Sequence, residues 1–289
     1  MQRLFFTRSA KLLQVTLVLL YAAMCRSAFA DVNFIFGVYA SDKPTAMVQS
    51  FRPLLNDLEA LLATRLGEPV SIKIQVSKTY EDGIDDLVEG KVDFARFGPA
   101  SYVVAKQKNE NIRLIAMESH KGKKEFNGII CVKSDSNIKS VKELVGKTFA
   151  FGDKTSTIGR YLSQQYLLAN GITANKLKSY DYLDRHDKVA TAVAAGDFDA
   201  GAIKEGTYKK LKEKGAPLEV IATFKNVTKP WIARSGLPDN LFLALQQALL
   251  ELKPKEDLDE LSKEGFLPGS DMDFVETKEA ILNNDHFFR

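Results

Sequence analysis

The feature that most constrains this chain is a regular alternation of strand-like and helix-like segments. Residues 33–39 are mostly apolar, residues 44–62 carry apolar side chains at helical spacing, and residues 70–76 alternate apolar and polar side chains. Two further strand-like segments, at 92–97 and 147–151, are each followed by a helix-like one. Such alternation predicts an α/β protein whose largely parallel sheets are covered by helices.

Two segments far apart in the chain share one local plan. Residues 87–95 and 193–201 each contain a helix end, a glycine, a hydrophobic residue, an aspartate and a strand of small residues. These segments stand at matching places in two α/β halves, and no Pro-, Gly- or Ser-rich linker separates the halves. The repeat predicts two similar lobes, joined by ordered strands that cross near 126–128 and 226–228.

The first 30 residues have the three parts of a secretory signal peptide. A basic start precedes an apolar run at 12–24, and residues 28–30, Ala-Phe-Ala, form a small-x-small cleavage site. The run is too short to span a bilayer about 30 Å thick, which disfavours the alternative of an uncleaved membrane anchor. Lipidation at Cys25 fits poorly, because the bulky Met24 stands where a small residue is wanted. We expect cleavage after Ala30 and a periplasmic mature protein.

Loss of this segment changes the charge and the cysteine content. The whole chain has a formal net charge of +3, and the segment carries four basic and no acidic residues, so the mature chain has a net charge of −1. This balance does not support a general attraction to nucleic acid or to a membrane surface. Cys131 is then the only cysteine, and its apolar, strand-like surroundings predict a buried thiol.

The turn at residues 151–160 is the richest candidate site. Ligands of open α/β sheets bind beyond the carboxyl ends of the strands, where helix N-termini also point. Thr155, Ser156 and Thr157 stand together at such a helix start, and Gly159 allows a ligand to approach closely. Free N–H groups and hydroxyls together make an anion site. An ordinary N-cap is the alternative, although it needs only one hydroxyl.

Three other strand-to-helix turns carry weaker signals. Residues 96–102 contain Gly-Pro before a helix, as a plain turn also does. Glu205 follows the strand at 198–203 and could accept a hydrogen bond from a ligand hydroxyl, although a surface charge is the usual case. His186 precedes a helix, where it could contact a ligand, cap the helix or lie on the surface.

Catalytic and metal-binding patterns are missing from the sequence. It contains no G-x-S-x-G, H-E-x-x-H or G-x-G-x-x-G, and no Cys/His cluster. Residues 146–148 end like a phosphate-binding loop, but Val141 stands where that loop needs its first glycine. We therefore predict a binding protein rather than an enzyme, with neither a cofactor nor a metal.

Five segments in register resemble the substrate-binding proteins of phosphate, phosphite and phosphonate ABC transporters. They are residues 92–99, 155–159, 186–189, 199–205 and 229–234. The resemblance covers most of the mature chain. It implies a type II periplasmic-binding-protein fold, in which two α/β lobes hold a ligand in the cleft between them. It also implies a monomer whose partners are a small oxyanion and an ABC permease.

The resemblance also implies boundaries and ligand contacts. Residues 31–126 and 228–289 would form lobe 1, and residues 127–227 would form lobe 2. The family contacts are a tyrosine after an early strand, the hydroxyl-rich helix start, a histidine and a carboxylate. In this sequence those positions are Tyr80, then Thr155, Ser156, Thr157 and the backbone of Ile158, then His186, and finally Glu205.

Two departures from the family pattern narrow the range of expected ligands. The turn after the third strand often carries Tyr, and here it is Phe97, which keeps an aromatic wall without a hydroxyl. Binders of aminoalkylphosphonates place an acid near the last motif's proline, where this chain has Lys229, whose charge would repel an amine. We therefore expect phosphite, phosphate or methylphosphonate. Glu205, which can only accept hydrogen bonds, would favour a ligand that still carries a P–OH group.

Two alternatives remain open at this point. The same exported fold could serve as a sensor that presents its closed state to a membrane receptor kinase. It could also bind a different small anion, such as a carboxylate or sulfate.

Overall fold

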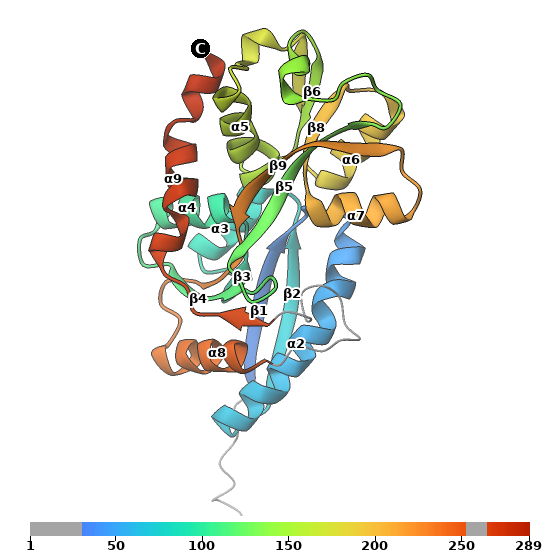
Figure 1. Ribbon diagram of the computed structural model, residues 1–289. Helices are drawn as coiled ribbons and strands as arrows, with labels where there is room; N and C mark the ends of the chain where they lie inside the picture. Colours follow the sequence, from blue (N-terminus) through green and yellow to red (C-terminus); the bar gives the residue numbers. More distant parts are fainter. Residues whose placement is uncertain (1–30, 253–264) are drawn as a thin grey trace, which may run out of the picture.

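Two β-sheets joined by two strands organise the part of the chain that the computed structural model describes, residues 31–252 and 265–289 (Figure 1). The predicted signal peptide, its cleavage site and Cys25 lie outside the described residues. None of the helices in the described part is both long and apolar enough to cross a membrane.

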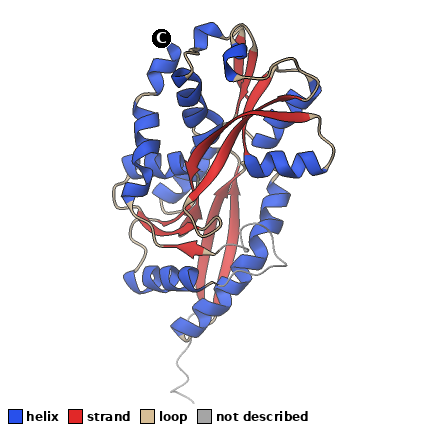
Figure 2. Cartoon of the chain, in the orientation of Figure 1, coloured by secondary structure: helices blue, strands red, loops and turns tan. Residues whose placement is uncertain are grey.

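The first sheet has six strands in the order β11-β4-β10-β3-β1-β2. Helices α2 and α8 cover one face, and α3 and α4 cover the other (Figure 2). Alternate side chains of a strand point to opposite faces, so Phe34 and Phe36 pack under α2 whereas Ile35 packs under α3. The elements are β1 (Val32–Tyr39), α2 (Pro44–Leu66), β2 (Val70–Ser77), α3 (Tyr80–Val88), β3 (Phe94–Arg96), α4 (Pro99–Lys108), β4 (Arg113–Glu118), β10 (Pro230–Ala233), α8 (Asp239–Glu251) and β11 (Phe266–Leu267).

The second sheet has five strands in the order β7-β6-β8-β5-β9. Helices α6 and α7 cover one face, and the other packs against α5 and the short helical turns around it. The elements are β5 (Glu125–Lys133), η1 (Val141–Leu144), β6 (Thr148–Phe151), η2 (Thr157–Leu162), α5 (Ser163–Ala169), η3 (Ala174–Lys176), β7 (Ser179–Tyr182), α6 (His186–Ala195), β8 (Ala200–Lys204), α7 (Glu205–Glu213) and β9 (Leu218–Val227).

Both sheets are mixed, whereas the sequence predicts largely parallel ones. The antiparallel pairings involve β5 in the second sheet and β10 and β11 in the first. The predicted α/β class with two lobes is confirmed. The antiparallel direction of some strands results from the way the chain crosses between the lobes. The carboxyl ends of the parallel strands face the other lobe, so β5 and β10, which each enter a lobe from a crossing, run against them. β11 follows α8 and pairs antiparallel with β4. The crossings follow β4 and β9, close to the predicted positions.

The internal repeat has the same structural role in both lobes. Gly90 and Gly196 each end a helix with a positive φ, +76° and +89°, which glycine adopts without a steric penalty. The aspartates that follow accept a backbone N–H from the neighbouring parallel strand: Asp93 from Ile35 at 2.9 Å and Asp199 from Thr148 at 2.8 Å. Each aspartate therefore joins the turn before its own strand to the neighbouring parallel strand of the sheet.

The C-terminal segment packs across both lobes. It comprises η4 (Asp271–Phe274), α9 (Val275–Leu282) and η5 (Asn284–Phe288). Phe287 is buried against Phe151 of the second lobe, with ring centroids 5.7 Å apart, and α9 also contacts α4 of the first. The assignment of residues 228–289 to lobe 1 alone does not describe this segment, because its apolar side chains complete the second core. The other lobe boundaries stay a prediction.

One buried residue in each lobe illustrates how the two cores are packed. Cys131 is fully buried, as predicted, and burial raises the pKa of its thiol to about 12, so it is inert at neutral pH. Trp231, on β10, is fully buried in the first lobe. Its ring stacks on Phe36 with centroids 4.7 Å apart and meets Phe266 edge-on at 5.2 Å.

Truncation of Trp231 tests how much this core stabilises the first lobe. We expect Trp231→Ala to lower the free energy of unfolding by about 3–5 kcal/mol, because it leaves a cavity between the sheet and α2. Trp231→Phe, which keeps an aromatic ring there, should cost clearly less. Urea unfolding followed by circular dichroism measures both, and equal losses for the two variants would contradict this account of the packing.

Candidate functional site

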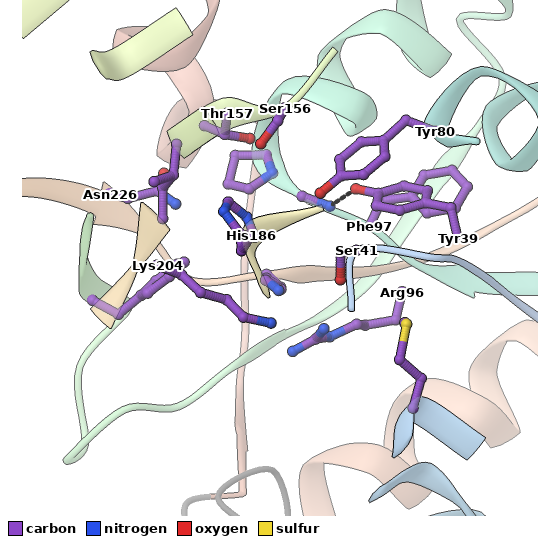
Figure 3. A pocket seen from close by; sticks show the side chains of 16 residues that line it. Tyr39, Ser41, Tyr80, Arg96, Phe97, Ser156, Thr157, His186, Lys204 and Asn226 are labelled. Atoms are coloured by element: carbon purple, nitrogen blue, oxygen red, sulfur yellow. Dashed lines mark hydrogen bonds between the residues drawn. The ribbon is translucent and has the colours of Figure 1, made fainter. Parts of the chain in front are cut away.

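A pocket lies where the carboxyl ends of strands from both lobes meet (Figure 3). Side chains from the first lobe, from the second lobe and from the crossing strands line it. They are Tyr39, Ser41, Met47, Tyr80, Arg96, Phe97, Gly98, Pro99, Phe126, Ser156, Thr157, Ile158, His186, Lys204, Asn226 and Lys229.

The predicted ligand contacts divide into two groups. Seven of the nine line this pocket: Tyr80, Phe97, Ser156, Thr157, Ile158, His186 and Lys229. Thr155 does not, because its N–H and hydroxyl both donate to Asp153, at 2.7 and 2.6 Å, within a local turn. Glu205 does not either; it pairs with Lys209 at 2.9 Å, accepts from Asn127 at 3.3 Å, and lines a wider cavity alongside.

The three neighbouring hydroxyls have three different partners. Thr155 stabilises the turn, and Ser156 is an ordinary N-cap that accepts the N–H of Gly159 at 2.9 Å. Thr157 Oγ1 accepts the N–H of Ala100 at 2.8 Å and so joins η2 of one lobe to the start of α4 in the other. A side chain at Gly159 would clash, since its Cβ would lie 2.8 Å from the Cα of Gly152.

Aromatic rings form one wall of the pocket. The ring of Tyr39 stacks on Tyr80, with centroids 3.7 Å apart, and on Phe97 at 5.2 Å. The Tyr39 hydroxyl accepts the N–H of Gly98 at 2.6 Å and lies 3.0 Å from the hydroxyl of Ser101 (Figure 3). Burial raises the pKa of Tyr39 to about 12 and that of Tyr80 well above its ordinary value. Both phenols therefore keep their protons at neutral pH.

Two cations of the pocket have a carboxylate partner. Glu118 accepts two hydrogen bonds from Arg96, at 2.6 and 2.9 Å, and a third from the indole of Trp231 at 3.1 Å. Lys204 pairs with Asp42. Burial alone would raise the pKa values of Glu118 and Asp42, but the adjacent positive charges outweigh it and hold both below their ordinary values.

Lys229 has no such partner. No carboxylate among residues 31–252 and 265–289 forms an ion pair with it, and it lines the same pocket as the two paired cations. Removal from water, together with the charges of Arg96 and Lys204, holds the pKa of Lys229 well below its ordinary value. Basic groups therefore outnumber carboxylates in the pocket, and an anion beside Lys229 would favour its charged form.

Two polar atoms in the pocket wall lack hydrogen bonds. His186 Nδ1 and Asn226 Oδ1 are buried without a partner in the described part of the chain. His186 is 5% exposed, and burial, aided by Lys204, lowers its pKa to about 3, so the imidazole is neutral. An unpaired buried polar group costs about 1–3 kcal/mol, so these atoms favour a site that receives a polar ligand.

Several wall residues stand at strand ends without a recognisable motif. Tyr39, Arg96 and Lys204 are the last residues of β1, β3 and β8, and Asn226 lies near the end of β9. Attention to the final residue of each predicted strand would have found Tyr39, whereas Arg96 and Lys204 lie one residue from the ends of the strands predicted at 92–97 and 198–203. Within the described residues, no group of three or more His, Cys, Asp or Glu side chains could hold a metal ion.

The chain matches one protein family over most of its length. Residues 36–274 match the family described as "ABC transporter, phosphonate, periplasmic substrate-binding protein". A probable ABC transporter phosphite binding protein, PhnD1, from Prochlorococcus marinus is 30% identical over 159 residues, 50% of this chain and 53% of that protein. The phosphate-import protein PhnD of Mycolicibacterium smegmatis is 26% identical over 177 residues, 57% of this chain and 53% of that protein. The chain thus aligns with about half the length of these relatives.

Solved structures share the fold over nearly the whole described chain. PhnD1 of Prochlorococcus marinus in complex with methylphosphonate has a TM-score of 0.75 at 22% identity, covering 87% of this chain and 98% of that one. A binding protein component of an ABC phosphonate transporter from Pseudomonas aeruginosa has a TM-score of 0.72 at 19% identity, covering 89% and 87%. At these identities the likeness concerns the fold alone.

The match to the family extends well beyond half of the chain, and the fold agrees with it. Members of this family are transporter binding proteins rather than enzymes, as the sequence predicted. The chain belongs to the periplasmic phosphonate-binding family of ABC transporters, with a type II periplasmic-binding-protein fold.

Proposed function

We propose that this protein captures a small phosphorus oxyanion without an ammonium group and delivers it to an ABC permease from the periplasm. The observation that carries the proposal is Lys229, a basic residue in the interlobe pocket that has no carboxylate partner within residues 31–252 and 265–289. An anion beside it would supply the missing negative charge, whereas an ammonium group would add to the repulsion. Phosphite, phosphate and methylphosphonate fit this charge and the small, aromatic-walled pocket.

The relatives support a phosphorus ligand. One is named for phosphite binding, another for phosphate import, and a structure with the same fold is in complex with methylphosphonate. Phosphorus oxyanions present several acceptor oxygens to the donors of this pocket. Each charge-assisted hydrogen bond contributes about 1.5–3 kcal/mol, so a few of them supply much of the ~8 kcal/mol that micromolar binding requires.

Thr155 and Glu205 have no place in the proposed anion contacts. Both have partners outside the pocket, and the preference for a P–OH group that rested on Glu205 therefore loses its geometric basis. The proposed contacts are the remaining predicted residues together with Arg96, Lys204 and Asn226.

Contacts between the lobes support capture by closure. Thr157 accepts from the backbone of Ala100, the N–H of His186 donates to the carbonyl of Ser41 at 3.3 Å, and Lys204 pairs with Asp42. Each contact joins a pocket residue of one lobe to the other lobe. A ligand that touches both walls would favour this closed arrangement over an open one.

A thermal-shift panel tests the ligand class with residues 31–289. We expect phosphite, phosphate or methylphosphonate to raise the melting temperature and 2-aminoethylphosphonate and sulfate to leave it unchanged. A ligand at 100 times its dissociation constant stabilises the fold by about 2.7 kcal/mol, which such a scan detects. Stabilisation by the aminophosphonate alone would contradict the role of Lys229, and no shift with any phosphorus compound would overturn the proposed function.

Removal of one hydroxyl tests the contact between the lobes. Thr157→Ala leaves the buried N–H of Ala100 without an acceptor and deletes a pocket hydroxyl, so we expect methylphosphonate to bind about tenfold more weakly. Thr157→Ser keeps the oxygen and should bind with nearly unchanged affinity. Isothermal titration calorimetry measures both, and Thr157→Ala binding as tightly as the wild type would place the anion elsewhere.

Proton uptake tests the charge state of Lys229. Its pKa lies well below the ordinary value, and an anion beside it would raise that pKa, so binding should take up protons and affinity should rise as the pH falls. Calorimetry in buffers of different ionisation enthalpy counts these protons. Lys229→Arg stays charged throughout and should take up fewer protons with the same ligand. Equal uptake by the two proteins would show that Lys229 does not titrate on binding.

A further inference from the structure

A wider cavity opens directly beside the anion pocket. The two share six wall residues, Ser41, Met47, Arg96, Phe126, Lys204 and Lys229, so a ligand in the pocket can extend into the cavity. Its outer walls come from the start of α2 in one lobe and from α7 in the other, which lie near each other in Figure 1. A phosphorus oxyanion alone would leave this cavity to solvent.

The carboxylates on the cavity wall are already neutralised. All four have a basic partner: Asp42 with Lys204, Glu118 with Arg96, Glu205 with Lys209, and Asp187 with Arg185. None of them is left to receive an ammonium group. A ligand substituent that enters this cavity therefore meets no unpaired negative charge among the described wall residues.

Three basic side chains on the same wall have no ion-pair partner within the described residues. Lys43, Lys210 and Lys214 line the cavity and form no ion pair with any residue in the described ranges. Lys210 and Lys214 stand four residues apart at the end of α7, so they share one side of it. Lys229 adds a fourth unpaired cation at the boundary with the anion pocket. The cavity thus carries a net positive charge beyond the one that a phosphorus group would neutralise.

Two further features suit an organic ligand. Met47 and Phe126 are apolar and line both the pocket and the cavity, so methylene groups of a ligand can pack against them. Thr228 also lines the cavity; it is 3% exposed, and its buried hydroxyl has no hydrogen-bond partner in the described part of the chain. That hydroxyl is free to bond a polar group of a substituent.

We propose that this cavity receives the organic substituent of the phosphorus ligand and prefers a substituent that ends in a second anionic group, such as a carboxylate. This inference rests on the proposed function, because the phosphorus group must occupy the anion pocket. It extends the ligand class from small oxyanions to phosphonates with an anionic tail.

Matched ligands test the inference on the mature protein. The anionic series is phosphonoacetate, 3-phosphonopropionate and 4-phosphonobutyrate, each compared with an alkylphosphonate of similar length and with methylphosphonate. We expect at least one carboxylate to bind about fivefold tighter than its alkyl counterpart at low salt, with the advantage shrinking as salt screens the lysines. 3-Aminopropylphosphonate should bind more weakly than propylphosphonate.

Charge-removing variants identify the groups responsible. The double variant K210Q/K214Q should lose most of the preference for the carboxylate and keep the wild-type affinity for methylphosphonate. The control K142Q/K178Q removes two exposed lysines of the same lobe that do not line the cavity, and it should keep the preference. Both pairs carry the same change of charge, so a general electrostatic effect would show equally in both.

The outcomes separate the inference from the proposed function. If methylphosphonate binds and no carboxylate exceeds its alkyl partner, the inference is overturned and the proposed function stands. A preference that survives in K210Q/K214Q overturns the assignment to these lysines. If no phosphorus compound binds at all, both fail together.

Discussion

The charge of the pocket depends on which of its basic side chains have a carboxylate partner. Arg96 is held by Glu118, and Glu118 is in turn held by the indole N–H of Trp231, a residue at the centre of the first core. The aromatic packing of a lobe therefore orients a charged group at its edge. Lys204 is balanced by Asp42 across the cleft, whereas Lys229 is left unbalanced. Lys229 is unpaired among the described residues while its two neighbours are paired, and this imbalance is the basis of the proposed preference for an anion.

The same residues that line the pocket also join the lobes. Thr157 meets the first turn of α4, and the backbone of His186 meets Ser41. Two backbone N–H groups at the start of α4, those of Gly98 and Ala100, already donate to Tyr39 and Thr157. The proposed recognition of the anion relies on side-chain cations and on buried polar atoms that have no partner in the described part of the chain.

Much of the site follows from short motifs at strand ends. The hydroxyl-rich turn, Phe97, His186 and Lys229 all line one pocket, although four separate segments supply them. Thr155 and Glu205 stand in the same motifs but point to other partners, which a motif cannot show. Arg96, Lys204 and Asn226 were missed because each looks like an ordinary residue at the end of a strand. The mixed sheets were also missed, since strand direction depends on where the chain crosses between lobes.

Periodicity, the repeated helix–Gly–Asp–strand plan and the family motifs were enough to predict the α/β class, the two lobes and seven of the sixteen residues that line the pocket. These features are local, because a few neighbouring residues set helix ends, strand patterns and turns. The pairing of each cation, the cavity beside the pocket and the packing of the C-terminal helix against both lobes required the folded chain. They depend on which side chains meet across long sequence separations, and that is settled by the packing of whole elements.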